Sequence, residues 1–202
     1  MRILSLILKV FSHWIAVSFL LVLLTKVDSF GQYKYEKESR IHSSELPFQL
    51  DLDFDAYAGV KRLKWYKELN VDQVHYEAKF RFEGSDYSVE FDSLGVLEDV
   101  EVLCRFKNLE DSLSRQLTRN INSLYKKWKI DKLQEQYLIN LDVLKAVLDQ
   151  SLSLKDLSSN YEMELIVLEQ GERNHYELLF DSNLNLIRIR RIVKDSSLNL
   201  EF

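Results

Sequence analysis

The chain has 202 residues, a formal net charge of −5, 46% hydrophobic residues and a single cysteine. The acidic balance argues against general binding to nucleic acid or to anionic membranes. Because one cysteine can form no internal disulfide, the fold must be held together by an apolar core. With five glycines and one proline in the whole chain, long flexible linkers are not expected.

Residues 1–31 follow the order of a secretory signal peptide. A positively charged start leads into the uncharged apolar run 15–24, and small residues then precede an expected cut after Gly31. This order predicts a periplasmic or secreted protein with no stable membrane insertion after cleavage. A retained anchor is the alternative, but a spanning helix needs about 20 mostly apolar residues, and Lys9 and Lys26 interrupt the run on its two sides.

The first expected unit covers residues 32–106. Its opening stretch, 33–41 (YKYEKESRI), is interpreted as an added edge strand or an ordered tail. A short helix should follow, because Ser44 can cap it and Pro47 suits its first turn. Gly59 would end this helix.

Alternating side chains predict about four antiparallel strands after this helix. Residues 60–69 form the first of them. In 76–82 (YEAKFRF) and 87–91, apolar residues alternate strictly with polar ones, which indicates one buried and one wet face. Gly95 suits the turn that precedes the last strand, 97–104.

The second expected unit, residues 107–202, repeats this order. Residues 87–97 (YSVEFDSLGVL) and 176–186 (YELLFDSNLNL) agree at apolar positions and differ at polar ones, as a duplicated fold would. The spacing of apolar residues predicts an amphipathic helix over 110–127, and the strand 129–138 follows it.

Residues 141–157 have no counterpart in the first unit. Their apolar residues are helically spaced and predict a short inserted helix packed on the second sheet. The predicted fold class is therefore α+β: two tandem repeats, each a helix packed on a roughly four-stranded antiparallel sheet. The other face of each sheet would stay open to water or to a partner.

Four stretches carry a resemblance to a known family. They are KWYKE (64–68), YEAKF (76–80), YSVEFDSLGVLEDVEV (87–102) and KIDKLQEQY (129–137). The organisation resembles the PepSY-like proteins exported by Bacteroidetes-type bacteria, and it is similar to the β-lactamase-inhibitor-protein architecture. The resemblance implies export and a non-enzymatic binding or inhibitory role. The second unit departs from the pattern, since it lacks the turn glycine and carries the inserted segment.

The sequence contains no motif of a catalytic, cofactor or metal site. His42, His75 and His175 are isolated from one another, and no HExxH, CxxC or GxSxG pattern occurs. Cys104 ends a strand with apolar neighbours and is expected to be buried and inert. No catalytic residue, cofactor or metal ligand is therefore predicted, and a small hydrolase with an unrecognised carboxylate site is the weakest hypothesis.

Two groups of residues are candidates for partner binding. Arg188 and Arg190 share one strand face, where they pair with Asp99 and Glu101 of the first unit or with local glutamates, or else form a patch for an anionic ligand or partner. If Trp65 belongs to the core, its neighbour Tyr66 is exposed among basic residues, as in a protein-binding surface. The candidate residues are Tyr66, Arg62, Lys64, Arg188 and Arg190.

The resulting hypothesis is a non-enzymatic exported binding protein. It would hold an unknown envelope or secreted protein or peptide on its open sheet faces, as an inhibitor or modulator of a peptidase or hydrolase. The alternative is a structural or accessory envelope protein that associates with itself. Neither hypothesis involves nucleic acid or a cofactor.

Overall fold

The computed structural model describes residues 32–69 and 73–194, which belong to one compact unit, Gly31–Phe202. The expected signal peptide, residues 1–31, lies outside the described residues. Within the described part of the chain, no helix is long and apolar enough to cross a membrane.

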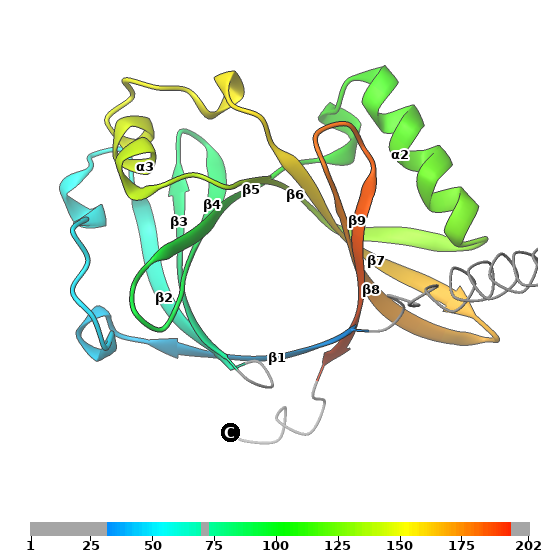
Figure 1. Ribbon diagram of the computed structural model, residues 1–202, viewed down its shortest axis with the longest axis horizontal. Coiled ribbons are helices and arrows are strands. Elements are labelled where there is room, and N and C mark those ends of the chain that lie inside the picture. Colours follow the sequence, from blue (N-terminus) through cyan, green and yellow to red (C-terminus); the bar gives the residue numbers. More distant parts are fainter. Residues whose placement is uncertain (1–31, 70–72, 195–202) are drawn as a thin grey trace, which may run out of the picture. The chain divides into compact units, whose positions relative to one another are not determined.

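The described residues form nine β-strands in one sheet that closes on itself (Figure 1). The strands are β1 (Gln32–Ile41), β2 (Lys61–Leu69), β3 (Val74–Phe82), β4 (Ser85–Phe91), β5 (Leu97–Leu103), β6 (Trp128–Tyr137), β7 (Asn160–Glu169), β8 (Glu172–Phe180) and β9 (Leu186–Lys194). Each strand pairs antiparallel with the next one along the chain. Since nine is an odd number, the first and last strands run in the same direction, and β1 closes the sheet by pairing parallel with β9.

This architecture shows that the predicted fold class is wrong. β5 pairs with β6 from Val100↔Tyr137 to Leu103↔Gln134, so strands of both expected repeats share one sheet. The α-helices of the described residues are only α2 (Asp111–Leu124) and α3 (Leu141–Leu148). Two units with a helix on four strands each are therefore not present. Period-two alternation specifies which face of a strand is buried, but it does not specify which strand lies beside it.

The helix expected between Ser44 and Gly59 is also absent. This segment holds only two 3₁₀ turns, Ser43–Glu45 and Phe54–Ala56. Its buried residues Leu52 and Phe54 are two positions apart, a spacing that suits an extended chain better than a helix. By contrast, the predicted helix over 110–127 is confirmed as α2.

The helix predicted within residues 141–157 is confirmed as α3, but it does not pack where the prediction placed it. Leu144, Val147 and Leu148 join the core cluster that contains Ala78 and Phe80 of β3, whereas the prediction placed this helix on the second sheet. The first half of the sheet has no α-helix of its own, and α3 covers its outer face. Figure 1 shows α3 and α2 beside different parts of the ring of strands.

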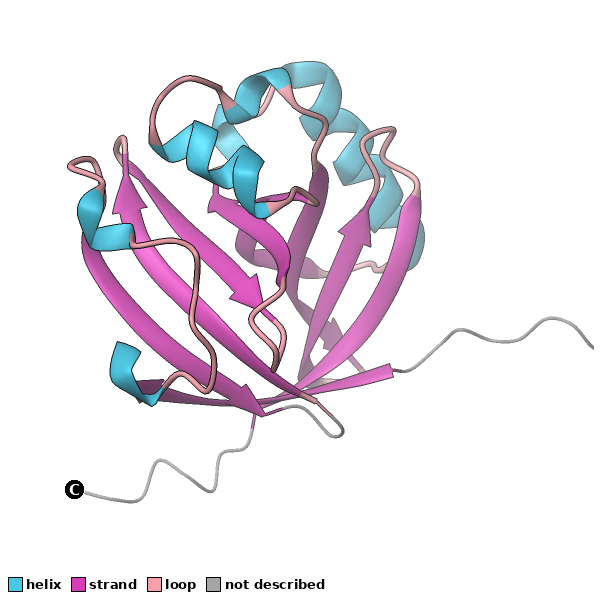
Figure 2. Ribbon diagram, turned by 60° about the vertical axis from the view of Figure 1, so that its left-hand side comes forward, coloured by secondary structure: helices cyan, strands magenta, loops and turns pink. Residues whose placement is uncertain are grey.

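The two faces of the closed sheet differ sharply in polarity. Apolar side chains point outward into two core clusters, one under α3 and the segment 46–60 and one under α2. Figure 2 shows that the helical segments lie outside the strands. Charged side chains point into the space that the sheet encloses, which we call the lumen. The expected open sheet face is thus replaced by an enclosed polar one.

An ion cluster lies at the seam where the sheet closes. Glu177 of β8 is fully buried, with Lys34 Nζ of β1 at 2.7 Å and Arg190 Nη2 of β9 at 2.5 Å. Burial alone would raise the pKa of Glu177, but Lys34 and Arg190 hold it below its usual value. One carboxylate therefore links β1, β8 and β9.

We expect Glu177→Gln to lower the free energy of unfolding by about 3–5 kcal/mol, because it removes the anion that compensates buried cations at the seam. Glu172→Gln is the matched control, since Glu172 is exposed on the same strand and should change stability by less than about 0.5 kcal/mol. Urea unfolding measures both variants. Equal stabilities would show that the cluster does not hold the seam together.

Candidate functional site

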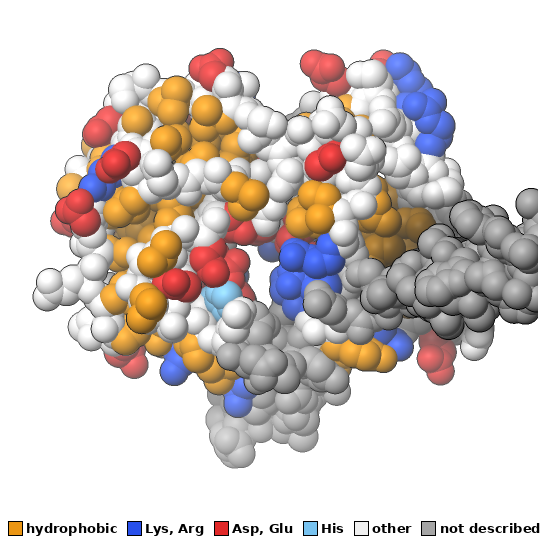
Figure 3. Space-filling model, viewed as in Figure 1, with side chains coloured by type: hydrophobic (Ala, Val, Ile, Leu, Met, Phe, Trp, Pro, Cys, Tyr) orange, Lys and Arg blue, Asp and Glu red, His pale blue; other side chains and the backbone are white. Residues whose placement is uncertain are grey.

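The lumen is the candidate site, and it contains two adjoining cavities. The cavity of about 590 Å³ contains most of the acidic residues, and we call it the acidic end. The cavity of about 410 Å³ is lined by five Lys or Arg side chains and one carboxyl group, that of Asp86, and we call it the basic end. Lys79 and Lys132 line both cavities. Figure 3 shows an opening in the middle of the molecule, with acidic side chains and a histidine on one side and Lys or Arg side chains on the other.

Carboxyl groups outnumber cationic side chains at the acidic end. Its described lining includes nine carboxyl groups and five Lys or Arg side chains. The carboxyl groups belong to Glu38, Glu68, Glu77, Glu90, Glu98, Asp99, Glu101, Glu162 and Glu164. Most of them occupy alternate positions of neighbouring strands, while Glu98 and Asp99 are consecutive at an irregularity in the β4–β5 pairing, and closing the sheet brings them together.

Several of these carboxyl groups lack hydrogen-bond donors or close cations. Within the described residues Glu101 has neither a hydrogen bond nor an ion pair. Glu162 is 6% exposed, and its ion pair is a distant one, 4.0 Å from Arg188. Asp99 accepts a hydrogen bond from Gln136 at 2.8 Å through Oδ2, while its buried Oδ1 has no partner in the described part of the chain. Unsatisfied buried acceptors are costly, which makes them suited to a ligand that donates.

Burial and mutual repulsion raise the pKa of these groups. The pKa of Glu101 rises to about 8, mainly through burial and then through the charge of Asp99. Asp99, beside Glu90, also has a pKa raised by burial to about 8, and the buried Glu162 has a pKa well above its usual value. Near neutral pH, part of this cluster therefore holds protons instead of negative charge.

Glu68 and Glu77 form a coupled pair with opposite shifts. Burial, and next the charge of Glu77, raises the pKa of Glu68 to about 8. Burial would also raise the pKa of Glu77, but Lys79, with its Nζ 2.9 Å away, and the donating Ser88 hydroxyl keep it lowered. One proton is thus placed on Glu68 while Glu77 stays ionised.

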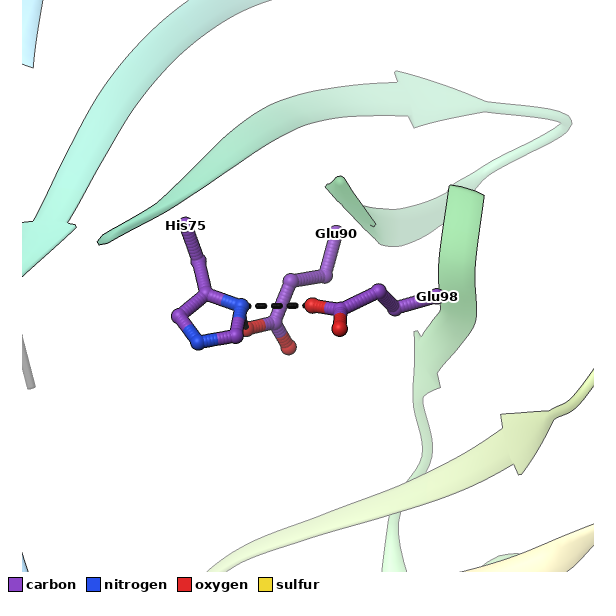
Figure 4. A group of neighbouring side chains, drawn as sticks. All are labelled: His75, Glu90 and Glu98. Atoms are coloured by element: carbon purple, nitrogen blue, oxygen red, sulfur yellow. Dashed lines mark hydrogen bonds and ion pairs between the residues drawn. The ribbon is translucent and has the colours of Figure 1, made fainter. Parts of the chain in front are cut away.

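A histidine contacts two glutamates in the lining of the acidic end (Figure 4). His75 Nδ1 lies 2.5 Å from Glu98 Oε2 and 3.1 Å from Glu90 Oε1. The donor atoms of these three residues lie within 4.8 Å of one another, and those of Glu38, Glu68 and Glu77 form a second such group. Both groups offer atom types that bind divalent metals.

Sequence reasoning missed the first of these groups because it treated the three histidines as isolated. His75, Glu90 and Glu98 come from β3, β4 and β5 and meet only through the register of those strands. The available signal was the run of polar residues on one face of each strand, but it could be used only once the strand order was known.

The basic end holds three of the predicted partner-binding residues. Arg62, Lys64 and Tyr66 line it together. Tyr66 is half-buried, and Lys79 Nζ lies 4.8 Å from its ring centre, within cation–π range. Arg62 sits in a bulge of β2 with a positive φ of 61°, an uncommon conformation for arginine. The predicted grouping thus exists in space, inside the lumen and not on an open face.

The other two predicted residues line the acidic end. Arg188 and Arg190 both contact Glu177, at 3.4 and 2.5 Å, which is the pairing with a local glutamate that the sequence offered as one alternative. Arg191 donates to Asn174 Oδ1 at 2.6 Å and lies outside this cluster. All five candidates therefore line the lumen, and their role in partner binding stays a prediction.

A larger cavity of about 920 Å³ lies outside the lumen, between the outer face of β4–β6 and residues 150–156. Cys104 lines it and is half-buried. Burial, and then the charge of Glu135, raises the pKa of the Cys104 thiol to about 12. The thiol stays protonated near neutral pH, which fits the predicted lack of reactivity.

No protein-family model and no curated protein matches the sequence. The solved structures that are similar to it include two from Bacteroides species. A BLIP-like protein from Bacteroides fragilis has 18% identity and a TM-score of 0.42, over 68% of this chain and 79% of that chain. A DUF2874 family protein from Bacteroides ovatus has 14% identity and a TM-score of 0.44, over 68% and 80%. One of these neighbours is BLIP-like, which is the architecture that the sequence resemblance named, whereas PepSY-like tandem repeats are not confirmed. Because both TM-scores lie below 0.5, function has to be argued from the lumen.

The raised pKa of Glu101 predicts a pH-dependent stability. The folded state keeps a proton that the unfolded chain releases, so the contribution of Glu101 to stability falls as pH rises from about 4.5 to about 8. The variant Glu101→Gln does not lose stability in this way, because a glutamine side chain does not titrate. We expect its Tm advantage over the native protein to grow across that range and to reach about 2–4 °C. Thermal unfolding at several pH values checks this, and a difference that does not change with pH would contradict it.

Proposed function

We propose that the chain is a non-enzymatic, exported binding protein that holds a small organic cation in the acidic end of its lumen. One observation carries this proposal: the carboxyl groups of Asp99, Glu101 and Glu162 gather in an enclosed cavity without enough cations to balance them. A cationic ligand would supply the charge and the hydrogen bonds that these groups lack.

The size of the cavity supports an organic ligand. A volume of about 590 Å³ lies within the range of small-molecule sites and far exceeds that of a single metal ion. A closed sheet of about eight strands has just enough interior for its own side chains or one small ligand, and a ninth strand adds room.

A second candidate function is contact with an envelope or secreted protein at the mouth of the acidic end. Leu138, directly after β6, and Ile187, in β9, are exposed apolar side chains that line the acidic end and form an apolar rim. Apolar residues around a polar opening are typical of interaction surfaces. The inhibitor or modulator role that the sequence resemblance implies would use this rim.

Isothermal titration calorimetry tests the proposed function. We expect 1,4-diaminobutane to bind at 1:1 stoichiometry at pH 7.5, and glutarate, a dianion of similar length, not to bind. The enthalpy should depend on the ionisation enthalpy of the buffer, because the cation displaces protons from carboxyl groups with raised pKa values.

Variants locate the site in the same experiment. The double variant Glu101→Gln/Glu162→Gln should weaken diamine binding at least about tenfold, or about 1.4 kcal/mol. The surface control Glu172→Gln should leave it unchanged. A protein that binds no diamine, or a double variant that binds it as well as the native protein does, would contradict the proposed function.

A further inference from the structure

We propose that the ligand of the lumen is a short linear peptide with both ends free, its ammonium group at the acidic end and its carboxylate at the basic end. This inference rests on the proposed function and goes beyond it, since it adds an anionic group, a length and an orientation. Three independent features of the lumen support it.

The first feature is a change from acidic to basic side chains along two neighbouring strands. The lumen-facing residues of β3 are, in order, His75, Glu77, Lys79 and Arg81. Those of β2 run the opposite way along the chain, as Arg62, Lys64, Tyr66 and Glu68. Because the strands are antiparallel, the pairs Glu68↔His75 and Lys64↔Lys79 make both gradients point in one direction.

The cations at the basic end are available to an anion. Within the described residues Arg62 and Lys64 have no ion pair, and both are exposed at the mouth of the cavity. Lys79, in contrast, already contacts Glu38 and Glu77 at 2.9 Å each. A carboxylate would thus be bound by Arg62 and Lys64, whose charges are not already compensated.

The second feature is the length of the charge gradient on β3. His75 and Arg81, the two ends of this gradient, are six residues apart on the strand, or about 20 Å at about 3.3 Å per residue. An extended peptide rises by about 3.3–3.6 Å per residue, so five or six residues span this length.

The third feature is an amide at the basic end. Gln134 is 3% exposed and lines this cavity, and its side chain has no hydrogen bond within the described residues. A carboxamide both donates and accepts, which matches a peptide group. A simple polyamine would supply neither an acceptor for Gln134 nor an anion for Arg62.

Four forms of pentaalanine test this inference in calorimetry: both ends free, N-acetylated, C-amidated, and both ends blocked. The free form should bind most tightly. Acetylation and amidation should each weaken binding at least about tenfold, and the doubly blocked form should bind weakest of all.

Two double variants assign each end of the peptide. Arg62→Met/Lys64→Met should bind free and amidated peptides equally while still rejecting the acetylated one. Glu101→Gln/Glu162→Gln should bind free and acetylated peptides equally while still rejecting the amidated one. Thermal unfolding of both variants confirms that they are folded, and exposed Arg62 and Lys64 leave the core intact.

Equal binding of the free and the amidated peptide by the native protein would overturn the inference. If 1,4-diaminobutane still binds in that case, the proposed function stands and only the peptide is excluded. If neither compound binds, both proposals fail.

Discussion

The parallel pairing of β1 with β9 is the constraint on which the rest of the molecule depends. Nine strands that alternate in direction can close only through a parallel pair, and parallel pairing is slightly less stable per residue than antiparallel pairing. The ion cluster around Glu177 reinforces the sheet at this point, because its cations come from the two strands that meet there. Without this closure the polar faces of all nine strands would be in water, and their carboxyl groups would have no reason to depart from ordinary pKa values.

Closure also explains why the protein has its apolar core on the outside of the sheet. The helices α2 and α3 and the segment 46–60 bury the outward side chains, and the stability they provide offsets the cost of a charged interior. Enclosed carboxyl groups with too few cations destabilise a fold. They form a preorganised binding site, since a ligand that brings the missing charge finds its partners already in place.

Much of the local structure could be predicted from the sequence, and the reason is periodicity. Alternation in YEAKFRF and helical spacing over 110–127 identified β3 and α2, because each pattern depends only on near neighbours in the chain. The same reasoning grouped Arg62, Lys64 and Tyr66 on one strand, and they line one cavity, although Tyr66 is half-buried and not exposed as expected. It failed where distant segments decide the outcome: α3 covers the half of the sheet that lacks a helix, β1 closes the ring, and His75 meets Glu98 across three strands. The matching stretches 87–97 and 176–186 indicated two similar hairpins, but similar hairpins can join one sheet as well as form two.

The closed sheet shields the buried carboxyl groups of the lumen from bulk water. The most direct test is a pH titration of the side-chain carboxyl carbons by NMR, in protein labelled with ¹³C at Asp and Glu. A closed lumen predicts that the resonances of Glu68, Asp99 and Glu101 titrate near pH 8, well apart from those of surface carboxyl groups. If every carboxyl resonance instead titrates between about pH 3 and 5, as exposed groups do, the lumen is open to water and the account of its chemistry is wrong.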